Sequence, residues 1–193
     1  MKTKIAIFAS GNGTNTEEII KHFQNHEHIE ISLILTNSPK AFVLQRAENH
    51  NIPYFVFTRE MFYKENTVDE VLKLNKIDFI VLAGFMWLIP GPFVTNFKNK
   101  IVNIHPALLP KYGGKGMYGS HVHEAVVKNK EKESGITIHW VNEKYDEGNI
   151  IFQAKCNVDS SDTAEDVAGK VHQLEHVFYP RIIEKVIKEF SVK

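Results

Sequence analysis

Residues 4–15, KIAIFASGNGTN, carry the clearest signal of the fold class. A compact apolar run ends at a glycine, and a helical pattern follows over residues 14–26, where Ile19, Ile20 and Phe23 have the spacing of one helix face. A short apolar run bounded by a glycine turn is typical of a buried strand. A buried strand that leads through a glycine turn into a helix is the first unit of a strand–helix–strand fold.

Strand and helix patterns continue to alternate along the chain. Such alternation predicts parallel βαβ units joined by right-handed crossovers. We therefore expect an α/β fold, a single-domain, open, mostly parallel doubly wound (Rossmann-like) sheet with helices on both faces and an antiparallel C-terminal hairpin. The predicted further strands cover residues 29–37, 52–57, 78–85, 100–105, 135–142 and 149–158, and the predicted further helices cover 40–50, 60–75, 121–129 and 163–191, the last with a break near Pro180.

The composition limits the possible partners. The chain has 193 residues, of which 43% are hydrophobic, and Lys+Arg and Asp+Glu number 23 each. This length predicts one domain over residues 1–193, and the balanced charge argues against a nucleic-acid partner. The apolar runs are too short for a membrane span or a signal peptide, and the single cysteine, Cys156, fits a reducing compartment. We expect a cytoplasmic monomer or homodimer that acts on small molecules, with Cys156 as a small strand residue.

The glycine loop after the first strand is a candidate anion site. Its glycines allow a tight turn, and the helix that follows offers unpaired N–H groups to an anion. A plain strand–helix turn is the alternative. A threonine replaces the third glycine of the dinucleotide fingerprint, and the Gly-Lys-Ser/Thr of a nucleoside-triphosphate loop is absent, so a phosphate monoester on the substrate fits better. The loop residues are Gly11, Asn12, Gly13, Thr14 and Asn15.

Asn103 and His105 close the strand pattern IVNIH at the same predicted crevice. Residues two apart on a strand point to the same side. An asparagine amide can stabilise a developing oxyanion, and a histidine can carry a proton near neutral pH. Asp146 adds a carboxylate in the turn YDEG, although Asp-Glu-Gly is also simply a good hairpin turn. His139, inside the preceding strand, is either a core histidine or part of the site wall.

A metal site at His121, His123 and Glu124 is not expected. The two histidines would face opposite sides of a helix, and no clear fourth ligand is placed.

Five motifs occur in order over nearly the whole chain, from about residue 4 to about 187: FASGNGTN, VLAGFMWLIP, NIHPALLPKYGG, ITIHWVNEKYDEGNII and LEHVFYP. Together they closely resemble the phosphoribosylglycinamide formyltransferase family, the folate-dependent enzymes of purine biosynthesis. The resemblance implies an open sheet with a Rossmann-like N-terminal half. It also implies direct transfer of the formyl group of 10-formyltetrahydrofolate, the co-substrate, to the primary amine of glycinamide ribonucleotide through a tetrahedral intermediate.

The resemblance also implies a set of site residues. Residues 1–100 would form the half that binds the ribonucleotide phosphate, and residues 101–193 the half that is catalytic and binds folate. The implied catalytic residues are Asn103, His105 and Asp146; the implied ribonucleotide residues are Gly11, Asn12, Gly13, Thr14, Asn15 and Glu175; the implied folate residues are Met86, Trp87, Leu88, Ile89, Val141, Asn142, Glu143, Lys144 and Tyr145.

The chain departs from the family pattern at several positions. The segment KGMYGSHVH, residues 115–123, replaces a short link, so either His121 or His123 fills the family's histidine position there. Trp87 stands where some members carry arginine, and His172 stands at the phosphate-site position three residues before Glu175. Two alternative functions stay open: a related formyl-folate enzyme, such as formyltetrahydrofolate hydrolase or methionyl-tRNA formyltransferase, and a binding module without catalysis.

Overall fold

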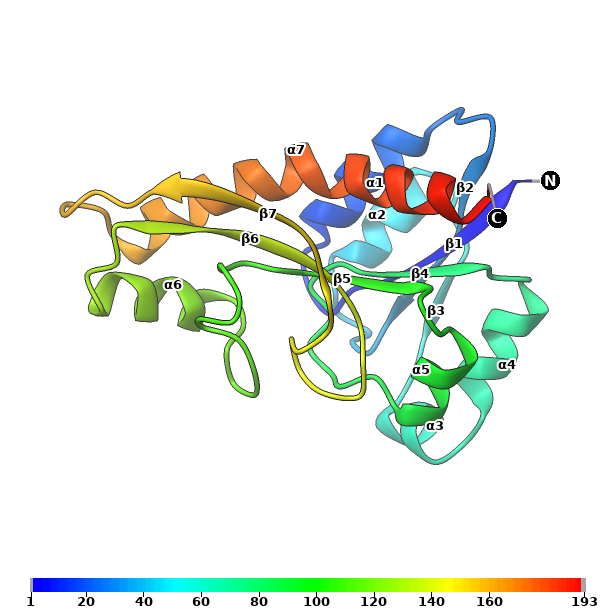
Figure 1. Ribbon diagram of the computed structural model, residues 1–193. Coiled ribbons are helices and arrows are strands. Elements are labelled where there is room, and N and C mark those ends of the chain that lie inside the picture. Colours follow the sequence, from blue (N-terminus) through cyan, green and yellow to red (C-terminus); the bar gives the residue numbers. More distant parts are fainter. Residues whose placement is uncertain (1, 192–193) are drawn as a thin grey trace.

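The computed structural model describes residues 2–191 and places a seven-stranded sheet at the centre of the molecule, in the order β3-β2-β1-β4-β5-β6-β7 (Figure 1). Neighbouring strands from β3 to β5 run parallel, whereas β6 is antiparallel to both β5 and β7. The predicted fold class is therefore confirmed. The strands are β1 (Thr3–Phe8), β2 (Ile29–Thr36), β3 (Tyr54–Val56), β4 (Phe79–Leu82), β5 (Ile101–His105), β6 (Glu133–Trp140) and β7 (Ile150–Asn157).

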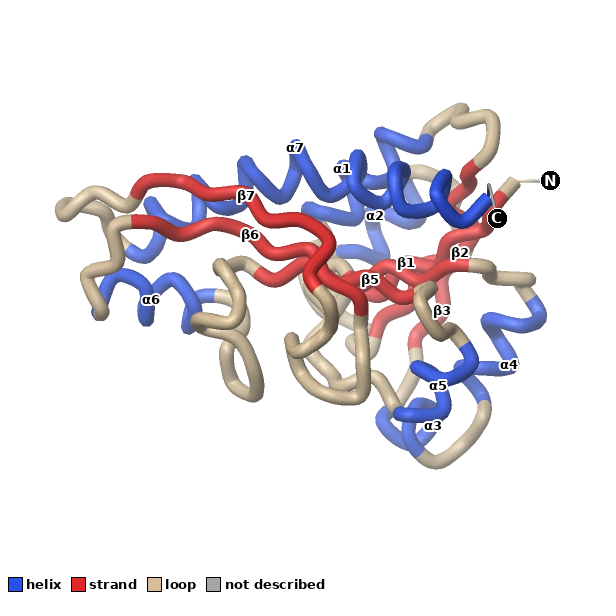
Figure 2. Tube along the Cα trace, in the orientation of Figure 1, coloured by secondary structure: helices blue, strands red, loops and turns tan. Residues whose placement is uncertain are grey.

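Helices cover both faces of this sheet (Figure 2). The alternation of side chains along β1 explains the two layers: Ile5 and Ile7 pack with residues of α1 and α7, whereas Ala6 and Phe8 pack with residues of α3, α4 and α5. None of the described helices has the length and apolar composition of a membrane span. The helices are α1 (Thr14–Phe23), α2 (Val43–Asn49), α3 (Arg59–Tyr63), α4 (Thr67–Leu74), α5 (Gly91–Asn96), α6 (Ser120–Lys128) and α7 (Ala164–Ser191).

Two details of the sequence prediction were wrong. The single helix predicted over residues 60–75 is two helices, α3 and α4, separated by residues 64–66. Thr58 caps α3 with its side chain, and a new helix begins after Asn66. The predicted break near Pro180 is absent, and α7 continues through this proline. Burial of the neighbouring Tyr179 and Ile183 against the sheet holds the helix together where one backbone hydrogen bond is lost.

The hydroxyl of Tyr179 fixes α7 to the centre of the sheet. This side chain is fully buried, and its hydroxyl donates to the carbonyl of Leu82 at 2.8 Å and lies 3.3 Å from the carbonyl of Val102. These two carbonyls belong to β4 and β5, the strands that lead into the loops of the crevice. Burial raises the pKa of Tyr179 well above its usual range, so the hydroxyl keeps its proton.

Replacing Tyr179 with phenylalanine should lower the free energy of unfolding by about 1–2 kcal/mol, because a buried hydrogen bond is lost and its acceptors stay buried. Urea unfolding followed by circular dichroism measures the change. Tyr54→Phe is the matched control, since the Tyr54 hydroxyl bonds Glu48 at the surface. A loss below about 0.5 kcal/mol for Tyr179→Phe would contradict the assigned role.

Candidate functional site

A cavity of about 730 Å³ opens at the carboxyl ends of β1, β4 and β5. The strand order reverses between β1 and β4, because β2 and β3 lie on one side of β1 and β4 and β5 on the other. Open α/β sheets bind their ligands at such a switch point. Segments far apart in the sequence form the cavity wall: residues 11–15, 83–86, 103–106, 114–120 and 145–146, with His123 and three residues of α7.

Asn103, His105 and Asp146 lie together at this cavity. The Asn103 amide nitrogen is 3.5 Å from one carboxylate oxygen of Asp146, and His105 Nδ1 is 3.5 Å from the other. The backbone N–H of Gly114 donates to the second oxygen at 2.9 Å. The structure therefore brings together the three residues that the sequence predicted as a catalytic group.

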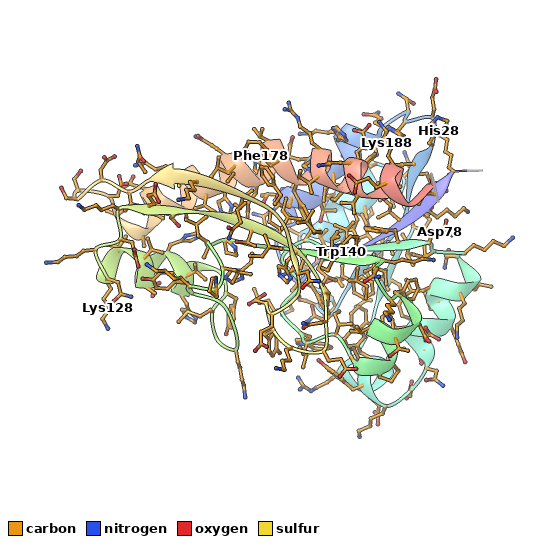
Figure 3. All side chains as sticks on the ribbon, in the orientation of Figure 1. His28, Asp78, Lys128, Trp140, Phe178 and Lys188 are labelled. Carbon is orange, nitrogen blue, oxygen red and sulfur yellow. The ribbon has the colours of Figure 1, made fainter. Side chains whose placement is uncertain are left out.

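The loop that carries Asp146 joins β6 to β7 and is closed at its base. Trp140, labelled at the centre of Figure 3, donates its backbone N–H to the carbonyl of Asn149 at 3.0 Å. Gly148 has no space for a side chain, since a Cβ there would lie 1.6 Å from the Trp140 carbonyl oxygen. Asp146 itself adopts a left-handed backbone with φ 55°, which aspartate tolerates better than most residues. These constraints hold the carboxylate over the end of β5.

His139, whose place the sequence left open, does not line the cavity but contacts two residues that do, Asn103 and Asp146. Its ring is 2% exposed, and its Nδ1 donates to the Trp140 carbonyl at 2.8 Å. Nε2 is then free to accept the Asn103 amide N–H at 3.1 Å, and it lies 3.6 Å from Asp146 Oδ1. His139 pairs with Asn103 in the register of β6 on β5, so the strand pairing itself supplies this contact.

The ionisation of the three residues follows from their burial and their neighbours. Burial lowers the pKa of His105 below its usual range and outweighs the nearby Asp146 charge, which raises it. The carboxylate of Asp146 thus raises the pKa of His105, as an opposite charge should, but the larger effect of burial sets the net direction. Burial raises the pKa of Asp146. The contacts with the His139 and His105 rings and with the Gly114 N–H outweigh burial, so the net pKa of Asp146 is lowered. At neutral pH the site holds a neutral imidazole beside a carboxylate.

The protonation of His105 has a defined geometry. Its Nε2 donates to the carbonyl of Tyr112 at 2.7 Å, so the neutral ring carries its proton on that nitrogen. Nδ1 then has a free lone pair, which faces Asp146. A proton taken up by Nδ1 would lie between the ring and the carboxylate, where the charge of Asp146 stabilises the imidazolium.

The glycine loop forms another part of the same cavity wall. All five predicted loop residues line the cavity, and Glu175 of α7 does so as well. The Asn15 amide donates to a Glu175 carboxylate oxygen at 2.9 Å, and His172 Nδ1 lies 2.8 Å from that same oxygen. The contact with Glu175 raises the pKa of His172. A buried carboxylate, a histidine and the first turn of α1 thus converge on one part of the cavity.

The structure distinguishes the two histidines of the His-Val-His segment. His123 is 3% exposed and lines the cavity, where its ring lies 6.4 Å from that of His172, whereas His121 is exposed. Among residues 2–191, no three or more His, Cys, Asp and Glu side chains gather as a metal site would need. Cys156 lies on β7, and burial raises the pKa of its thiol, as expected for a strand residue.

The predicted folate residues divide into two groups. Met86 and Tyr145 line the cavity, and the other seven do not. Trp87 packs instead among the aromatic rings of α3 and neighbouring segments, and Ile89 is 3% exposed in the core. The loop of residues 141–145 lies close to the start of α5, since a Cβ on Gly91 would be 3.2 Å from the Glu143 carboxylate.

Comparison with known proteins gives a consistent result. The model of the family described as "Formyl transferase" matches residues 3–183. The chain belongs to the formyl transferase family. Phosphoribosylglycinamide formyltransferase of Bacillus subtilis (strain 168) is 36% identical over 189 residues, which cover 95% of this chain and 94% of that protein. The chloroplastic phosphoribosylglycinamide formyltransferase of Arabidopsis thaliana is 36% identical over 97% of this chain. The chain spans 66% of the length of that protein, and 62% of the length of the chloroplastic relative from Vigna unguiculata.

Solved structures of the family share this architecture. Phosphoribosylglycinamide formyltransferase from Anaplasma phagocytophilum superposes with a TM-score of 0.89 at 34% identity, covering 98% of this chain and 88% of that one. The corresponding enzyme from Bacillus halodurans gives 0.86 at 36% identity and 95% of both chains. The resemblance inferred from the five motifs is thus confirmed at the level of the family and of the fold.

Removing the charge of Asp146 should lower the pKa of His105 further, because that carboxylate is its nearest stabilising charge. An NMR titration of the imidazole in Asp146→Asn measures this shift against the wild-type protein. Glu147→Gln is the control, since this neighbour is exposed and pairs with Lys144. An unchanged or higher His105 pKa in Asp146→Asn would contradict the electrostatic account.

Proposed function

We propose that this chain transfers the formyl group of 10-formyltetrahydrofolate to the primary amine of glycinamide ribonucleotide, giving formyl-glycinamide ribonucleotide and tetrahydrofolate in purine biosynthesis. One observation carries the proposal: a single cavity holds both an anion-suited helix start and the group Asn103, His105 and Asp146. The relatives that align over nearly their full length bear the name of this activity.

In the proposed reaction His105 removes the proton from the attacking amine. Its pKa is lowered, so the ring is neutral at neutral pH and can accept a proton on Nδ1. Asp146 then stabilises the imidazolium that forms, and the same proton can pass to the departing folate nitrogen. No covalent enzyme intermediate is required, since the amine is itself the nucleophile.

Asn103 is proposed to stabilise the oxyanion that develops on the formyl oxygen. One of its amide hydrogens is committed to His139 at 3.1 Å, and the other reaches Asp146 only at 3.5 Å. The weakly held hydrogen is the one available to the substrate. His139 thereby keeps the amide in the orientation in which nitrogen, and not oxygen, faces the reacting group.

The ribonucleotide phosphate is proposed to bind the first turn of α1. Glu175 would lie on the ribose side, and His172, whose pKa is raised by its contact with Glu175, would lie beside it. The loop residues for this role are Gly11, Asn12, Gly13, Thr14 and Asn15. The first half of the chain, 1–100, would thus supply most of the phosphate contacts. The second half, 101–193, would supply the catalytic group and Glu175; residues 1, 192 and 193 lie outside the described structure.

The folate is proposed to bind between the loop of residues 86–89 and the loop of residues 141–145. Met86 and Tyr145 would contact it through their side chains, since both line the cavity. Trp87, Leu88 and Ile89 would contribute backbone groups, because the Trp87 ring packs among the aromatic rings and Ile89 is buried. Residues 141–144 would form the opposite wall.

A turnover assay tests the proposal directly. Purified protein is incubated with 10-formyltetrahydrofolate, with and without glycinamide ribonucleotide, and release of the deformylated folate is followed. We expect release to depend on the ribonucleotide, with one formyl-ribonucleotide formed per folate released. Equal release without the ribonucleotide would identify a hydrolase and overturn the proposal.

In the same assay Asn103→Ala should lower kcat by about a hundredfold or more, since one oxyanion donor contributes about 3–4 kcal/mol to transition-state stabilisation. Asn75→Ala is the control, because the Asn75 side chain donates to the Val71 carbonyl within α4 and Asn75 does not line the cavity. A loss under about threefold for Asn103→Ala would contradict its role.

A further inference from the structure

The glycine loop leads into α1 without a side-chain cap. Gly13 adopts a left-handed backbone with φ 72°, and α1 begins without any hydrogen bond from a capping side chain. The first N–H groups of α1 have no partner within the helix and are available to an anion. A loop of this kind needs an external support if its N–H groups are to point in one direction before the ligand arrives.

Helix α2 supplies that support. Arg46 donates through Nε to the Asn12 carbonyl at 2.8 Å and through Nη2 to the Asn12 side-chain oxygen at 3.0 Å. Val43 donates its backbone N–H to the Gly11 carbonyl at 3.2 Å, and its side chain fills the space beside Gly13, where a Cβ would lie 2.6 Å from it. The guanidinium therefore holds both oxygens of the central loop residue in one planar fork.

The guanidinium is itself fixed in place. Its Nη1 donates to Glu17 in the first turn of α1 at 3.1 Å, and His50 Nε2 lies 2.9 Å from the other oxygen of Glu17. The Phe42 ring lies 5.1 Å from the guanidinium carbon. Arg46 does not line the cavity, and Glu17 balances its charge, so it is placed to act through Asn12 and not by contact with an anion.

We propose that Arg46 is a positioning residue for the ribonucleotide: it joins the start of α1 to α2 and so orders the phosphate-binding loop in advance of binding. This inference rests on the proposed function for its substrate, whereas the ordering of the loop does not. Order established before binding lowers the entropy lost when the ligand binds. Removal of the Arg46 side chain should therefore weaken binding of the ribonucleotide and leave binding of the folate unchanged.

The test compares Arg46→Ala with Arg46→Lys and with Gln45→Ala, an exposed neighbour on the same helix. We expect Arg46→Ala to raise KM for glycinamide ribonucleotide about tenfold, with kcat and the KM for 10-formyltetrahydrofolate within about twofold of wild type. Arg46→Lys should recover only part of the loss, because one ammonium group cannot bond both Asn12 oxygens and Glu17 at once. Gln45→Ala should match wild type.

A second readout does not depend on turnover. Hydrogen–deuterium exchange of the ligand-free protein should be faster in Arg46→Ala over residues 10–17 and unchanged around Asp146. A KM for the ribonucleotide within twofold of wild type, or an equal rise in both KM values, would overturn the inference. If wild-type protein shows no ribonucleotide-dependent turnover, the proposed function fails. The exchange experiment then still tests whether Arg46 orders the loop, and unchanged exchange over residues 10–17 in Arg46→Ala would overturn the inference.

Discussion

The carboxylate of Asp146, whose side chain is 12% exposed, is the point at which the separate parts of the catalytic end meet. It contacts His105 and Asn103 from β5, His139 from β6, and the Gly114 N–H from the loop beyond β5. Each of these groups is largely withdrawn from water, so each depends on the others for its polar partners. The antiparallel pairing of β6 on β5 brings them together, because it places His139 beside Asn103 and returns the chain to the crevice through the loop that carries Asp146.

The same sheet explains why the phosphate end and the catalytic end share one cavity. Strands β1, β4 and β5 are parallel neighbours, so the loops after them emerge at one edge. Helix α7 then crosses this arrangement and brings Glu175 to Asn15, which is 160 positions earlier in the chain. Tyr179, four residues further along α7, anchors the helix to the carbonyls of β4 and β5. The packing of the core and the placement of the site residues therefore depend on the same helix.

The sheet and the position of the site at its edge could be predicted from the sequence, because their signals are local and periodic. The apolar run ending at Gly11 and the spacing of Asn103 and His105 fix the edge of the sheet and the face of the strand. Contacts set by register or by distant helices could not be read in this way. His139 was ambiguous because a buried strand histidine has the same pattern whether it meets the core or Asn103.

The other features that sequence reasoning missed also depend on tertiary packing. The net pKa of His105 could not be read from the sequence, because the burial that outweighs the charge of Asp146 is a property of the folded chain. Arg46 carries no motif signal, since its fork is recognisable only once α2 lies beside the glycine loop. The continuity of α7 through Pro180 likewise depends on packing against the sheet.

The most informative measurement is a crystal structure of the protein with bound glycinamide ribonucleotide, because this one substrate should extend across both ends of the cavity. We expect its phosphate within hydrogen-bonding distance of the backbone N–H groups of residues 13–15, and its primary amine directed at His105 and Asn103. A phosphate bound elsewhere, or an amine directed away from these two side chains, would refute the proposed placement of the site.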